Sequence, residues 1–106
     1  MINDSRISMI GGGSWATALV KILNENHHIV NWWMRNEKSI EHLQNKHRNP
    51  HYLSSLEFQP EFILPSADLE KVISAGEIIF LAVPAAFLKG VLKNCTPENF
   101  KNKVVL

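Results

Sequence analysis

Residues 6–16 read Arg-Ile-Ser-Met-Ile-Gly-Gly-Gly-Ser-Trp-Ala, and this stretch decides the fold. The apolar residues up to Ile10 predict a short strand, which the three glycines from Gly11 to Gly13 end. Ser14 is a candidate cap for a helix over residues 15–26, where apolar residues recur at helical spacing. The chain is therefore expected to open with a strand, a glycine-rich turn and a helix.

The rest of the chain continues this alternation. We expect further strands at residues 28–33, 62–64, 77–83 and 103–106, with a helix before each of the last three. Asn36 and Ser66 are candidate helix caps, and Pro84 suits a first helical turn. Residues 77–83 are so apolar that we expect a parallel strand covered on both faces. The alternation predicts an α/β fold with a doubly wound parallel sheet.

Composition restricts the classes of protein to consider. The 106 residues carry a formal net charge of +1, which argues against a nucleic-acid partner bound to a basic face. Their length and 45% hydrophobic content are typical of one globular domain, residues 1–106. Residues 78–86 form the longest apolar run, too short for a membrane span, and residues 1–6 lack a signal-peptide pattern. With only one cysteine no internal disulfide can form, so we expect a cytoplasmic protein.

The glycine turn has the spacing Gly11-x-Gly13-x-x-Ala16 between a strand and a helix. Gly11 permits the tight turn, and Gly13 has no side chain, so a pyrophosphate can approach the backbone. Ala16 is small enough for the helix to lie close to the strand. The helix N-terminus offers free N–H groups and a partial positive charge to phosphates. This pattern predicts a dinucleotide cofactor and, with the doubly wound parallel sheet, a Rossmann dinucleotide-binding domain.

Position 35 bears on which dinucleotide is bound. An NAD site usually places an acidic residue about 20 residues after the glycine turn, to bind the adenosine ribose. Here Arg35 occupies that place, and an arginine can pair with a 2′-phosphate. The residue therefore favours NADP, although stacking of Arg35 on adenine would also permit NAD.

Residues 11–19, Gly-Gly-Gly-Ser-Trp-Ala-Thr-Ala-Leu, carry a more specific signal than the glycine spacing alone. This run resembles the N-terminal domain of bacterial NAD(P)-dependent glycerol-3-phosphate dehydrogenases. Further segments resemble that family in the same order: Trp-Met-Arg-Asn at 33–36, Asn-Pro-His-Tyr-Leu at 49–53 and Ala-Val-Pro-Ala at 82–85. The resemblance covers about residues 7–106. The chain departs from the family at Ala16, where glycine is usual, and at Ala85, where a serine hydroxyl is expected.

The resemblance implies roles for particular residues. Ser14 and Trp15 would contact the diphosphate region of the cofactor. Arg35 would lie at the adenosine ribose or its 2′-phosphate, and Tyr52 near the adenine. Pro84 would line the cofactor cleft at the carboxyl end of its strand, which is also where open α/β sheets bind ligands.

The resemblance also implies an activity for a longer parent protein, the reduction of dihydroxyacetone phosphate to glycerol 3-phosphate with NAD(P)H, which feeds glycerophospholipid synthesis. The catalytic residues and the C-terminal helical substrate domain are expected beyond Leu106, so we expect no turnover from this chain alone. A homodimer of the parent protein is a further expectation, with no nucleic-acid partner and no membrane span.

Two alternatives remain open. Two-domain reductases of the ketopantoate reductase or 6-phosphogluconate dehydrogenase type begin with the same unit, and Rossmann domains also serve as non-catalytic nucleotide sensors. The Ser14-Trp15 pair and residues 49–53 favour the dehydrogenase. The histidines do not have metal-ligand spacing, since Pro50 separates His47 from His51, so no metal is expected.

Overall fold

The computed structural model describes residues 6–106, so residues 1–5, which belong to the segment without a signal-peptide pattern, lie outside the described part. It contains a five-stranded, all-parallel sheet with the strand order β3-β2-β1-β4-β5. The strands are β1 (Ile7–Ile10), β2 (Val30–Trp33), β3 (Ile63–Ser66), β4 (Ile78–Leu81) and β5 (Val104–Val105). The helices are α1 (Ser14–Glu25), α2 (Glu37–Lys46), α3 (Leu69–Ala75) and α4 (Ala85–Val91), with 3-10 turns η1 (Pro60–Phe62) and η2 (Pro97–Phe100).

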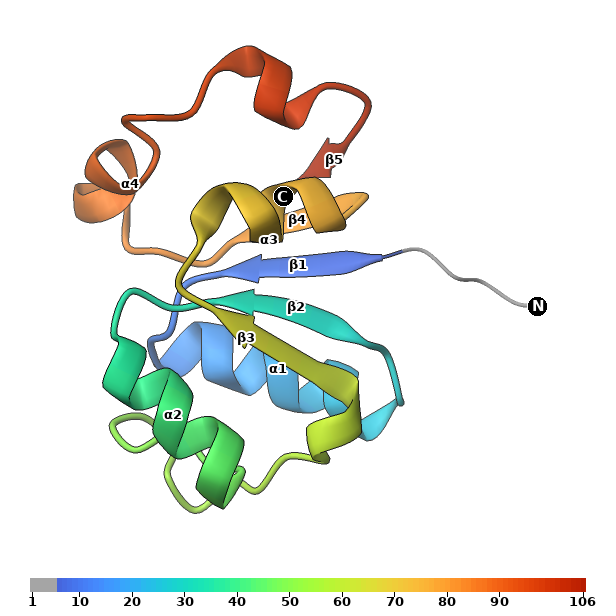
Figure 1. Cartoon of the computed structure of the whole chain (residues 1–106), viewed down its shortest axis with the longest axis vertical. Helices are drawn as coiled ribbons and strands as arrows, with labels where there is room; N and C mark the ends of the chain where they lie inside the picture. The colour runs from blue at the N-terminus through green and yellow to red at the C-terminus, as the bar shows by residue number, and fades with distance from the viewer. Residues whose placement is uncertain (1–5) are drawn as a thin grey trace.

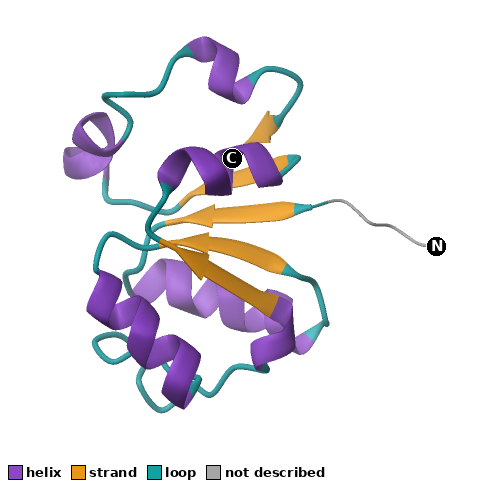
Figure 2. Ribbon diagram, viewed as in Figure 1, coloured by secondary structure: helices purple, strands orange, loops and turns teal. Residues whose placement is uncertain are grey.

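The sheet is doubly wound, as the sequence predicts. The chain runs outward from β1 through β2 to β3, then crosses over and continues with β4 and β5 on the other side of β1. Helices α1 and α2 cover one face, whereas α3 and the segment after β4 lie on the other (Figure 1). Figure 2 shows the strands as a central layer between these helices. The reversal of direction between β1 and β4 is the place where such sheets bind ligands.

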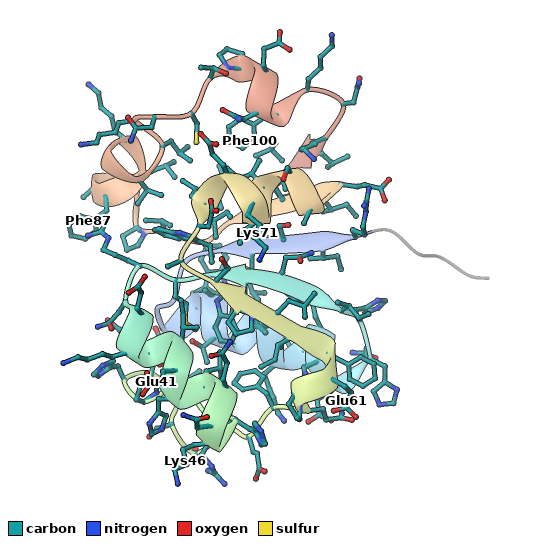
Figure 3. All side chains as sticks on the ribbon, viewed as in Figure 1. Glu41, Lys46, Glu61, Lys71, Phe87 and Phe100 are labelled. Carbon is teal, nitrogen blue, oxygen red and sulfur yellow. The ribbon has the colours of Figure 1, made fainter. Side chains whose placement is uncertain are left out.

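Each face of the sheet has its own apolar core. The core under α1 and α2 includes Met9, Val20 and Trp32, all fully buried. The core on the α3 face includes Ile10, Trp33 and Ile79, with Phe100 of η2 packed against it (Figure 3). Because side chains alternate along a strand, the adjacent Trp32 and Trp33 enter opposite cores.

The first residues of the helices match the predicted caps at α2 and differ from them at α1, α3 and α4. Asn36 caps α2 as expected, its side chain accepting from the N–H groups of Lys38 and Ser39. Asp68, not Ser66, caps α3, because β3 runs on through Ser66. The N-cap of α1 is Gly13, so Ser14 is the first helical residue and gives no side-chain cap. Similarly, Pro84 directly precedes α4 rather than forming its first turn.

Strand β4 is less covered than its apolar sequence predicts. Only Ile79 is fully buried, whereas Ile78, Phe80 and Leu81 are half-buried. The physical reason is the placement of the helices: α1 packs on β1 and β2, and α4 has no buried residue. The expectation of a strand covered on both faces therefore holds only in part.

Candidate functional site

A cleft of about 580 Å³ opens at the carboxyl ends of β1, β2 and β4. Its volume lies within the range of small-molecule and cofactor sites. Its walls come from the glycine turn, the end of β2, the loop after α2, and the turn from β4 into α4. The lining residues are Gly11, Gly12, Gly13, Trp33, Met34, Arg35, Asn36, Ser39, Asn49, His51, Tyr52, Ala82, Val83, Pro84, Phe87 and Val91.

Gly11 occupies a place that only glycine fits. Its φ is +133°, a conformation that residues with a side chain rarely adopt. A Cβ there would lie 2.4 Å from the carbonyl oxygen of Ala82, the residue that follows β4. The turn therefore passes close to β4 because position 11 has no side chain.

Gly13 is open toward solvent. Its φ of −81° and ψ of −169° are extended, and a Cβ would meet no atom within 4 Å. Neither the backbone conformation nor the neighbouring atoms of this chain therefore require glycine at position 13. Its missing side chain leaves free space next to the backbone at the start of α1, as close approach of a phosphate group requires.

Buried side chains hold the carbonyl groups of the turn. Trp32 Nε1 donates to the Gly11 oxygen at 2.6 Å, and Thr17 Oγ1 donates to the Gly13 oxygen at 2.6 Å. Asn49 Nδ2 donates to the Gly12 oxygen at 3.1 Å. The carbonyl groups of all three glycines therefore point toward the interior.

The N–H groups of the turn consequently point the other way. In a trans peptide the C=O and the next N–H are antiparallel, and the described residues contain no cis bond. The N–H groups of Gly12, Gly13 and Ser14 have no hydrogen-bond partner within residues 6–106. Together with the N-terminus of α1, whose first turn holds no acidic residue, they form a surface suited to an anion.

The opposite wall is formed by the end of β2 and the loop after α2. Arg35 is exposed and lies two residues after the end of β2, directly before Asn36, the N-cap of α2. His51 and Tyr52 contribute from the loop, and both side chains are exposed. The lining holds no carboxylate, so Arg35 and the free N–H groups give this cleft a positive character.

The third wall is apolar and follows β4. Val83, Pro84, Phe87 and Val91 line it. Phe87 is 60% exposed and projects from α4 at the carboxyl end of the strands (Figure 3). Aromatic and aliphatic surface beside free N–H groups is the combination expected for a ligand that joins a planar ring to phosphates.

The predicted site residues divide into two groups. Five of them line the cleft, namely Gly11, Gly13, Arg35, Tyr52 and Pro84. The other three lie on the first turn of α1 outside the lining: Ser14 and Trp15 are exposed, Trp15 at 68%, and Ala16 is fully buried. The burial of Ala16 in the α1 core agrees with the small residue expected there. Contact of these eight residues with a cofactor stays a prediction.

Sequence reasoning missed the residues that support the turn. Thr17, Trp32 and Asn49 come from α1, β2 and a loop, and each is at most 1% exposed. Asn49 belongs to a segment that resembles the dehydrogenase family, but the two groups to which its Nδ2 donates lie 32 and 37 positions away. No local pattern could have identified that contact.

Outside the cleft, the histidines and Cys95 do not form a metal-binding or catalytic cluster in the described residues. Within residues 6–106 there is no group of three or more His, Cys, Asp or Glu that could hold a metal ion. Burial, and secondarily the charge of Glu70, raises the pKa of the Cys95 thiol. The described residues contain no helix long and apolar enough to cross a membrane.

The sheet order, the glycine turn at the switch point and the cleft define a Rossmann-type domain of the dinucleotide-binding class. Residues 6–106 match the model of the family described as NAD-dependent glycerol-3-phosphate dehydrogenase N-terminus. The chain therefore belongs to this family of N-terminal domains.

Curated relatives and solved structures agree with this assignment. The chain is 40% identical over 93 residues to a glycerol-3-phosphate dehydrogenase [NAD(P)+] from Azotobacter vinelandii, covering 88% of this chain and 27% of the relative. A relative of the same name from Pseudomonas syringae is 38% identical, covering 87% of this chain and 27% of the relative. The chain thus spans about a quarter of the length of these relatives.

The fold is similar to that of solved dehydrogenases. A glycerol-3-phosphate dehydrogenase from Plasmodium falciparum has a TM-score of 0.83 at 27% identity, covering 96% of this chain and 31% of that one. The Coxiella burnetii enzyme has a TM-score of 0.84 at 24% identity with the same coverage, which supports the fold alone.

Proposed function

We propose that this chain binds NAD(P) in the cleft and is the cofactor-binding part of a glycerol-3-phosphate dehydrogenase. The observation that carries this proposal is the position of the glycine turn: its unpartnered N–H groups lie in a cleft of the size and polarity that a dinucleotide needs. The family match over residues 6–106 supports the choice of enzyme over a related reductase.

The residues of the chain would divide the work of binding. The N–H groups of Gly13 and Ser14 would donate to the diphosphate, whose charge the N-terminus of α1 stabilises. Arg35 would pair with a 2′-phosphate, so we propose that NADP is preferred over NAD. Tyr52 would lie on the adenine side, and Pro84 would line the part of the cleft next to α4. When bound, the nicotinamide supplies the hydride chemistry.

The whole protein's activity is a further part of the proposal. The complete gene product would interconvert dihydroxyacetone phosphate and glycerol 3-phosphate and so supply glycerophospholipid synthesis. Since the relatives are much longer, we propose that the catalytic and substrate-binding residues lie outside residues 1–106. We also propose a cytoplasmic location, supported by the lone Cys95, and a homodimer, which size-exclusion chromatography with light scattering would test.

The test is cofactor oxidation by the complete gene product with dihydroxyacetone phosphate, with NADPH and NADH in parallel. We expect cofactor oxidation that requires dihydroxyacetone phosphate. At equal low cofactor concentrations, NADPH should be oxidised faster than NADH. Arg35→Gln should lower the ratio of kcat/KM for NADPH over NADH about 10-fold or more, the cost of a charged hydrogen bond.

Lys38→Gln is the matched control, because Lys38 is an exposed cation on α2 that does not line the cleft. It removes the same charge and should leave the ratio unchanged. Cofactor binding without any oxidation would contradict the proposed reaction and favour a sensor or another reductase. An equal fall of the ratio in both variants would contradict the role of Arg35.

A further inference from the structure

Asn49 is a buried polar residue that joins two walls of the cleft. It is 1% exposed and lies in the loop after α2, before Pro50. The N–H groups of His51 and Tyr52 donate to its Oδ1 at 3.0 and 3.3 Å. Because two backbone donors must face an oxygen, these contacts fix which end of the carboxamide is Nδ2.

The fixed Nδ2 group faces the glycine turn. It donates to the Gly12 carbonyl oxygen at 3.1 Å and to Thr17 Oγ1 at 3.0 Å. Thr17 Oγ1 in turn donates to the Gly13 carbonyl oxygen. One side chain therefore restrains two successive peptide groups of the turn, the Gly12–Gly13 peptide directly and the Gly13–Ser14 peptide through Thr17.

Restraint of a carbonyl also restrains the N–H of the same peptide. With its C=O held toward Asn49, the Gly12–Gly13 peptide must present the Gly13 N–H on the opposite side. A glycine peptide without such a restraint would rotate freely, since glycine populates several backbone conformations with similar energy. Preorganised donors bind an anion better than donors that must first be ordered.

We propose that Asn49 is a positioning residue for the cofactor diphosphate: its carboxamide orients the peptide groups of the glycine turn so that the Gly13 and Ser14 N–H groups face the ligand. This inference rests on the proposed function, because it takes the cleft to hold a dinucleotide. Asn49 itself touches no ligand in this account and acts through Gly12 and Thr17.

Asn24 offers a matched control within the same chain. It is fully buried near the C-terminus of α1, and its carboxamide also bridges to backbone groups of a loop. Its Nδ2 donates to the Gln59 carbonyl oxygen at 3.0 Å, and its Oδ1 accepts from the Gln59 N–H at 2.9 Å. Asn24 thus anchors the other end of the segment between α2 and η1 without contacting the turn.

The experiment measures binding of two ligands by calorimetry to the chain and its variants Asn49→Ala, Thr17→Val and Asn24→Ala. NADP⁺ contains the diphosphate, whereas adenosine 2′-monophosphate lacks it. We expect Asn49→Ala to weaken NADP⁺ binding about 10-fold or more, as for the loss of buried hydrogen bonds. Binding of the monophosphate should fall clearly less than that of NADP⁺, since Asn49 reaches the adenine side only through the backbone of His51 and Tyr52. Asn24→Ala should leave binding of both ligands unchanged in the folded protein.

Each contrary result has a separate meaning. Undiminished NADP⁺ binding by Asn49→Ala overturns the inference, as does an equal loss with Asn24→Ala or an equal loss for both ligands. If Asn49→Ala does not fold, Thr17→Val tests the same inference and should also weaken NADP⁺ binding. It removes the hydroxyl that accepts from Asn49 Nδ2 and donates to the Gly13 carbonyl oxygen. Absence of NADP⁺ binding by the unaltered chain overturns the proposed function and this inference together.

Discussion

Gly13→Ala separates the fold of this chain from its binding function. A Cβ at position 13 meets no atom within 4 Å, and the extended backbone there suits alanine. Alanine should stabilise the folded protein by about 0.4–1 kcal/mol, because it restricts the unfolded chain more than glycine does. The substitution should also destabilise the folded protein by a similar amount, about 0.5–1 kcal/mol, because alanine is a poorer N-cap than glycine. The free energy of unfolding should therefore change by less than about 0.5 kcal/mol.

Binding should respond quite differently. The added methyl group would occupy the open space beside the Gly13 and Ser14 N–H groups and keep phosphate oxygens from approaching them. Loss of one charged hydrogen bond corresponds to about 1.5–3 kcal/mol, a weakening of NADP⁺ binding of about 10- to 150-fold.

Gly90→Ala is the matched control, measured by urea unfolding and calorimetric titration in parallel with Gly13→Ala. Position 90 is also open, with nothing within 4 Å of a Cβ, but it lies within α4 and is not itself one of the residues that line the cleft. This variant should gain about 1 kcal/mol of stability from helix propensity and bind normally. Normal binding by folded Gly13→Ala would refute the placement of the diphosphate.

Three other predictions concern stability and reactivity. Gly11→Ala should lower the free energy of unfolding by about 2–5 kcal/mol in urea titrations, since its methyl would strike the Ala82 carbonyl at a positive φ; a loss below 1 kcal/mol would contradict the turn geometry. Asn36→Ala should cost about 1 kcal/mol in the same assay through loss of the α2 cap, and an unchanged midpoint would show that the cap is dispensable. Because burial and Glu70 raise the pKa of Cys95, iodoacetamide should alkylate it at pH 8 more slowly in the folded chain than in urea; equal rates would refute this.

Local sequence patterns were sufficient for the fold. The glycine turn follows a strand and opens a helix, and the alternation of elements gave the parallel, doubly wound sheet. Asn36 was identified as a cap because a capping residue acts on N–H groups only two and three positions away. The glycine turn, the alternation of elements and the Asn36 cap are each determined by residues close together in the sequence.

Local signals were not sufficient where two nearby residues can both cap a helix, or where contacts between distant segments determine the structure. Ser66 and Asp68 can both cap a helix, and the pairing of β3 with β2 through Ser66 leaves the role to Asp68. The family resemblance implies that Trp15 contacts the cofactor; the structure places it outside the cleft lining on an exposed face of α1, and the contact stays a prediction. The cleft itself could be placed at the glycine turn, but the contribution of Phe87 depends on where α4 lies.

The proposed function requires that the diphosphate of a dinucleotide binds at the glycine turn. The most direct test is to titrate NADP⁺ into the isotope-labelled chain and follow each backbone amide by NMR. We expect the largest shifts at Gly12, Gly13 and Ser14, with further changes at Arg35. The structure has a further cavity between α2, β3 and α3. Shifts confined to that cavity, or no shifts at all, would contradict binding at the glycine turn.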